Sequence, residues 1–106
     1  MALSDSPLVL PLKGEIDLHV SPGIALSLAG LAATRRASIV LDLTDVTYVD
    51  SSGLAVLIQG MQDVREYGGM FALAGLPENV RPIFEIAGLD QIFQIFPDVN
   101  AALAAT

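Results

Sequence analysis

The stretch Tyr48-Val49-Asp50-Ser51-Ser52-Gly53-Leu54 decides the fold, because a strand ends in it and a helix begins in it. Its first two residues are good strand formers. Aspartate and serine accept hydrogen bonds from the free amides of a first helical turn, so Asp50 or Ser51 is expected to be the N-cap residue. The sequence therefore predicts a strand-to-helix turn in the middle of the chain.

The helix that follows this turn shows the clearest periodicity in the sequence. Its apolar positions are Leu54, Leu57, Ile58, Met61 and Val64. Residues spaced in this way share one side of a helix, which predicts a buried face. The pair Gly68-Gly69 is a typical stop signal at the C-terminal end.

Three further apolar runs predict strands on either side of this unit. Ser38–Leu43 and Met70–Ala74 are short and apolar, as is typical of buried strands. Leu8–Ile16 is also compatible with a strand, and Pro11 within it indicates an edge position or a bulge. Ile92–Phe96 is either a last short strand or the end of a loop.

Another helix is predicted between Leu8–Ile16 and Ser38–Leu43. Ser21 followed by Pro22 favours a helix start, with the serine as N-cap and the proline in the first helical position. Apolar residues at Ile24, Leu28 and Leu31 define one face. The helix is expected to end near Arg35 and Arg36, whose charges suit the negative end of the helix dipole.

Two more helices are predicted towards the C-terminus. Val80, Ile83, Phe84 and Ile86 form a helical pattern, with Gly88 as its C′ residue. Pro82 is tolerated only in a first turn, so this helix either starts well after Pro77 or is kinked. Asp98–Ala105 is the last helix. The alternation of strands and helices predicts an α/β fold, with a mainly parallel or mixed sheet of four to five strands and four helices.

Composition bounds the class of protein. The 106 residues fit one domain, 1–106, and a net charge of −7 disfavours nucleic acid and anionic membranes as partners. There is no cysteine, so disulfides and thiolate metal sites are excluded. No apolar run is long enough for membrane insertion, and Met1–Leu12 lacks the basic start of a secretory signal. We expect a cytoplasmic protein.

The sequence offers no convincing catalytic or metal site, and we predict neither an enzyme nor a cofactor. His19 is the only histidine and has no second ligand at metal-binding spacing. The two serines of the turn lack a nucleophile elbow and an assignable base, and no phosphate-binding glycine loop is present. Asp42, Asp45 and Asp50 are better explained as solvated carboxylates than as a Mg²⁺ site.

A phosphate on Ser51 would change the charge of this turn strongly. It would add about 1.5 to 2 negative charges at neutral pH. The helix dipole would tolerate that charge, whereas Asp50, and possible neighbours Asp17 and Asp45, would increase the repulsion of an acidic partner. From the residues alone, simple helix capping remains an equally good explanation of these serines.

Several of these elements together carry a resemblance to a known family. They are Gly14-Glu15-Ile16-Asp17, Val40-Leu41-Asp42-Leu43, Val49-Asp50-Ser51-Ser52-Gly53-Leu54 and Ala87-Gly88-Leu89. In order and spacing, residues 8–105 resemble the STAS domain family, and specifically the stand-alone bacterial anti-sigma factor antagonists. The resemblance implies a single STAS-like domain that regulates transcription through protein docking.

The resemblance also implies a mechanism and its residues. Ser51 would be phosphorylated by an anti-sigma factor that is a serine kinase. The unphosphorylated chain would bind that kinase and free the sigma factor, and a phosphatase would restore the serine. The partner-binding residues would be Asp17, Asp50, Ser51, Ser52, Gly53 and Leu54. The alternative is a constitutive subunit or ligand sensor of a transport or signalling complex, in which Ser51 and Ser52 only cap the helix.

Overall fold

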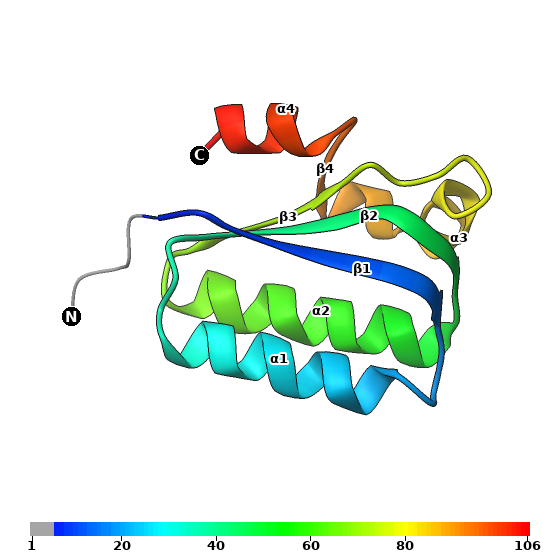
Figure 1. Ribbon diagram of the computed structural model, residues 1–106, viewed down its shortest axis with the longest axis horizontal. Helices are drawn as coiled ribbons and strands as arrows, with labels where there is room; N and C mark the ends of the chain where they lie inside the picture. The colour runs from blue at the N-terminus through cyan, green and yellow to red at the C-terminus, as the bar shows by residue number, and fades with distance from the viewer. Residues whose placement is uncertain (1–5) are drawn as a thin grey trace.

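Four parallel strands form one sheet in the order β1-β2-β3-β4 (Figure 1). The computed structural model describes residues 6–106, so the first five residues of the stretch tested for a secretory signal lie outside it. The elements are β1 (Leu8–Ile16), α1 (Ser21–Ala33), β2 (Ser38–Val49), α2 (Ser51–Glu66), β3 (Met70–Ala74), α3 (Arg81–Ile86), the 3₁₀ helix η1 (Leu89–Gln91), β4 (Gln94–Phe96) and α4 (Val99–Ala104). The predicted α/β fold is confirmed.

The helices cover the two faces of the sheet unequally. Each of the first three strands is followed by a helix and then by the next strand of the sheet, and right-handed crossovers in one direction put such helices on one face. Accordingly, α1 and α2 lie together below the sheet in Figure 1, and α4 lies above it. No helix within residues 6–106 is long and apolar enough to cross a membrane.

The main hydrophobic core lies between the sheet and the layer of α1, α2 and α3. It contains the apolar faces predicted for α1 and α2, with Leu28 and Leu57 almost fully buried. Of the third helical pattern it contains Val80 and Phe84, whereas Ile86 is 88% exposed and lies outside the core. A smaller cluster packs α4 through Ala102 onto the opposite face, against Val40 of β2. The site described below lies at one end of the larger core.

Pro11 and Pro82 lie where the pattern indicated, whereas Pro22 is the second residue of its helix and not the first. Pro11 is in β1, which is an edge strand, and the pairing of β1 with β2 shifts register just after it. Pro82 lies in the first turn of α3, so this helix starts at Arg81, after Pro77, and is not kinked by an internal proline. Gly88 has φ of 72° directly after α3, as expected for a C′ glycine.

Several predicted boundaries were wrong. Ser21 is not the N-cap of α1, because the helix already includes it and Val20 occupies the cap position. The same helix ends at Ala33, before Arg35, which takes a left-handed conformation with φ of 53°. The strand predicted at Ser38–Leu43 continues to Val49, and the last strand begins only at Gln94.

Candidate functional site

The site lies where β1 and β2 end side by side. Ile16 pairs with Val49 in the parallel register, so the turns that leave these two strands start next to each other. The backbone N–H of Asp50 donates to the carbonyl oxygen of Ile16 at 3.0 Å. The turn into α1 and the turn into α2 are therefore joined at the carboxyl edge of the sheet.

Asp50 is the residue that organises the start of α2. Its Oδ1 accepts hydrogen bonds from the Gly53 N–H at 2.9 Å and from the Ser52 hydroxyl at 2.6 Å. Its Oδ2 accepts from the Leu18 N–H, in the other turn, at 3.2 Å. The Ser52 hydroxyl, followed by the Gly53 N–H, lowers the pKa of Asp50 below its ordinary value, because these donors favour the charged carboxylate.

This pKa shift predicts a pH-dependent contribution to stability. Asp50→Asn should lower the urea midpoint at neutral pH, because the amide removes the charge and presents N–H groups to existing donors. A lowered folded-state pKa means that the carboxylate stabilises the fold above about pH 4, and that this is lost as pH falls through the folded pKa. Urea unfolding of both proteins across this range checks it. A difference unchanged down to about pH 2.5 would contradict the assignment.

The two serines of the turn differ in what their hydroxyls do. Ser52 is partly buried, and its hydroxyl hydrogen is given to Asp50. Ser51 is exposed, and its hydroxyl has no hydrogen-bond partner among residues 6–106. Of these two serines, Ser51 is therefore the one that offers a free hydroxyl to another molecule.

A third serine, Ser21, lies behind Ser52. The two hydroxyl oxygens are 3.2 Å apart, and Ser21 also donates to the Asp17 carbonyl at 2.6 Å. Each hydroxyl carries one hydrogen, and the shorter contacts to Asp17 and Asp50 use both. The contact between Ser21 and Ser52 is therefore not a further hydrogen bond, and Ser52 remains oriented towards Asp50.

Asp17 builds the neighbouring turn. Its carboxylate accepts from the backbone N–H groups of His19 at 3.0 Å and Val20 at 3.3 Å. These bonds order the turn that precedes α1, and the helix itself has no side-chain cap at Val20. An open hollow of about 530 Å³ lies between the turns, lined by Asp17, Leu18, His19 and Asp50.

Gly53 and Leu54 are placed behind the exposed surface. A Cβ on Gly53 would lie 2.6 Å from the Ile16 carbonyl oxygen and 2.9 Å from Cγ1 of Val49, so glycine is needed for α2 to start this close to the strands. Leu54 is partly buried and packs against the core. These two residues hold the helix start in place, whereas Ser51 faces solvent.

The structure brings together most of the residues singled out in the sequence. Asp17 and Asp50 share the hollow, but Asp45 lies within β2, opposite Lys13. Sequence reasoning missed the role of the Leu18 amide, for which the sequence carries no signal because Leu18 and Asp50 are 32 positions apart. Within residues 6–106 no group of three or more acidic, histidine or cysteine residues is placed to hold a metal ion.

Fold and site together define a small parallel α/β domain that presents one free serine at an acid-capped helix start. Comparison with known families agrees with this description, since the STAS domain model matches residues 1–102. The chain belongs to the STAS domain family. Its relatives place it among the anti-sigma factor antagonists, which are non-enzymatic regulatory proteins.

Three comparisons illustrate the similarity. The anti-sigma-B factor antagonist of Bacillus subtilis is 33% identical over 92 residues, which cover 87% of this chain and 84% of that protein. The crystal structure of an anti-sigma factor antagonist from Mycobacterium paratuberculosis superposes with a TM-score of 0.85 at 25% identity, covering 96% and 87% of the two chains. A sulfate transporter family protein from Wolinella succinogenes shares the fold alone, with a TM-score of 0.78 at 16% identity, covering 99% and 88%.

Proposed function

We propose that this chain is a phosphorylation-controlled antagonist of an anti-sigma factor. Unphosphorylated, it binds an anti-sigma factor that is also a serine kinase, and this binding frees a sigma factor. Phosphorylation of Ser51 releases the chain, and a phosphatase returns it to the binding form. The docking surface comprises Ser51 with Asp17, Asp50 and Ser52, held in place by Gly53 and Leu54.

The difference between the two adjacent serines carries this proposal. A kinase needs a hydroxyl that can enter its active site and lose its proton. The Ser51 hydroxyl is exposed and unbonded, whereas the Ser52 hydroxyl donates to Asp50 at 2.6 Å. If both serines served only to cap α2, the exposed one would be expected to bond to the helix, and Asp50 already caps it.

Phosphate transfer to Ser51 would alter charge without altering the fold. The Ser51 oxygen attacks the γ-phosphorus of ATP, ADP leaves, and a base on the kinase takes the hydroxyl proton. The product adds about 1.5 to 2 negative charges at the N-terminal end of α2, where the helix dipole favours them. The phosphate would stand close to Asp50 and to the hollow that Asp17 also lines. Its charge therefore repels an acidic partner surface, and its loss of hydration makes contact with an apolar partner surface unfavourable.

The test is transfer of phosphate from ATP by the cognate anti-sigma factor. Wild type and Ser52→Ala should each gain one phosphate, and Ser51→Ala should gain none, because Ser51 is the serine of this turn whose hydroxyl is free. Intact-protein and peptide mass spectrometry measure both outcomes. Phosphate retained in Ser51→Ala, or absent from wild type, would instead support a constitutive subunit in which the serines are structural.

A further inference from the structure

Helix α1 is unusual for a helix on the outside of an acidic domain. Its sequence, Ser21–Ala33, contains no charged residue, although the chain carries a net charge of −7. Its outward positions, including Leu26, Ser27 and Gly30, are exposed. A helix that is apolar on all sides is normally buried on all sides, so this outer face has the composition of a covered surface.

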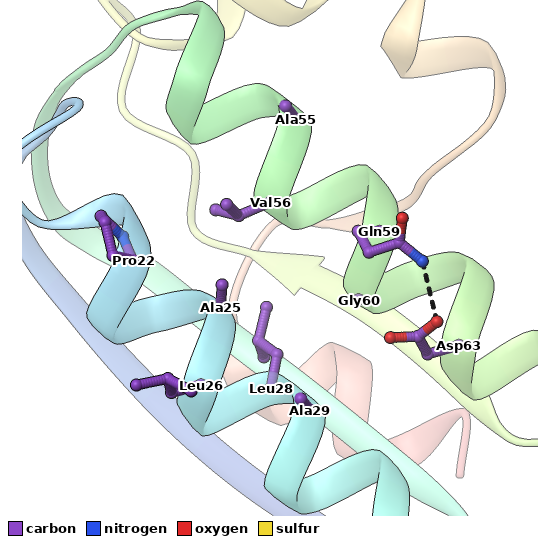
Figure 2. A pocket seen from close by; sticks show the side chains of 10 residues that line it. All are labelled: Pro22, Ala25, Leu26, Leu28, Ala29, Ala55, Val56, Gln59, Gly60 and Asp63. Atoms are coloured by element: carbon purple, nitrogen blue, oxygen red, sulfur yellow. Dashed lines mark hydrogen bonds between the residues drawn. The ribbon is translucent and has the colours of Figure 1, made fainter.

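A groove runs between α1 and its neighbour α2 on this same face (Figure 2). We call it the α1–α2 groove; it has a volume of about 670 Å³ and is lined by Ala25, Leu28 and Ala29 of α1 and by Val56 and Gly60 of α2, among others. In Figure 2, Val56 points from α2 into the space between the helices. Asp63 is the only charged residue between positions 6 and 106 that lines it, and it accepts a hydrogen bond from Gln59 at 2.9 Å.

The absence of charge indicates which occupant suits this surface. A face that bound a basic partner would present acids, and one that bound an acidic partner would present bases. Here α1 has no charge, and α2 has none from Ser51 to Gln62. Two copies of a chain with a net charge of −7 repel each other, and this repulsion is smallest where the two copies meet through a surface free of formal charge.

The shape of the face is also self-complementary. Leu26 projects from α1 at the rim of the α1–α2 groove and is 77% exposed. In an isologous dimer both copies use the same patch. A side chain that projects from one copy can then fill the groove of the other, and the two-fold axis repeats this contact. We infer that the chain forms a dimer through this face, with Leu26 of each copy entering the α1–α2 groove of the other.

The size of the face sets the expected strength of this dimer. Thirteen helical residues extend about 20 Å, and the patch is only two helices wide. The area of such a patch is small compared with the roughly 800 Å² that each partner buries in a standard stable interface. The dissociation constant is therefore expected in the micromolar range or above, and the dimer should dissociate on dilution.

Sedimentation equilibrium of the full chain over roughly 5–500 µM tests the association. Wild type should show a concentration-dependent monomer–dimer equilibrium, and Leu26→Glu should raise the dissociation constant at least about tenfold, because it places a charge in an apolar groove. Ile86→Glu is the matched control, since Ile86 is 88% exposed on α3 and does not line the groove. A wild type that stays monomeric, or equal effects of both substitutions, would overturn the inference.

Cross-linking tests the arrangement, and the chain is suited to it because it contains no cysteine. A tagged Leu26→Cys variant mixed with an untagged Val56→Cys variant should give a disulfide-linked heterodimer under mild oxidation. A tagged Ile86→Cys variant mixed with the same Val56→Cys variant should give only the background level. Equal yields in the two mixtures would show that Leu26 does not enter the groove. Neither experiment involves Ser51, so the outcome is independent of the proposed function.

Discussion

Replacing Ser51 with aspartate is expected to weaken docking of the anti-sigma factor by at least about tenfold, with little change in stability. The added carboxylate stands next to Asp50 and the hollow that Asp17 also lines, so negative charge accumulates where the partner binds. The Ser51 hydroxyl caps nothing, and a carboxylate in the first turn suits the helix dipole, so stability should change by about 0.5 kcal/mol or less. Titration calorimetry and urea unfolding measure the two effects separately.

The matched control is Ser51→Asn, which has nearly the same shape as aspartate but no charge. It should retain most of the affinity, because the proposal attributes release to charge. Equal losses of affinity in the two variants would show that size at this position, and not charge, decides docking. Unchanged affinity in both would favour the constitutive subunit.

Gly53→Ala is expected to have the largest effect on stability of any single methyl addition to the site. The new Cβ would lie 2.6 Å from the Ile16 carbonyl oxygen and 2.8 Å from its Cγ2, so α2 must move away from β1. Overpacking of this kind costs about 1 to 3 kcal/mol. The free energy of unfolding in urea measures the loss.

Gly30→Ala provides the control for helix propensity. Gly30 is in α1 and has nothing within 4 Å of its would-be Cβ. Alanine should therefore stabilise the fold there, by up to about 1 kcal/mol, because glycine is the poorer helix former. If Gly53→Ala were as harmless as Gly30→Ala, the close approach of α2 to β1 would not be important for the fold.

Local signals in the sequence were sufficient for most of the fold. The elements that could be predicted are those whose signals lie within a few neighbouring residues. These signals are the periodic apolar face of α2, the short apolar runs of the strands, and Pro11 and Pro82. The predicted ends of elements were wrong where contacts with distant residues determine how far an element extends. The strand from Ser38 continues past Thr44 because β1 pairs with it as far as Val49, which local composition does not reveal.

The candidate site was predicted in part for the same reason. The sequence identified the turn and its acids, but it left Asp50 and Ser51 as equal candidates for the N-cap. The structure gives that role to Asp50 and leaves Ser51 unbonded. The bonds that Asp17 and Ser21 make could not be foreseen, because they depend on how the chain turns between β1 and α1.

The bond from the Asp50 N–H to the Ile16 carbonyl also sets when this turn can form during folding. The Leu18 amide, a second hydrogen-bond partner of the turn, lies 32 positions before Asp50, so neither contact exists until the ends of β1 and β2 lie side by side. An unfolded or half-made chain has the same serine in its sequence but lacks these contacts. A partner that recognises the assembled turn would therefore respond only to chains that have finished folding.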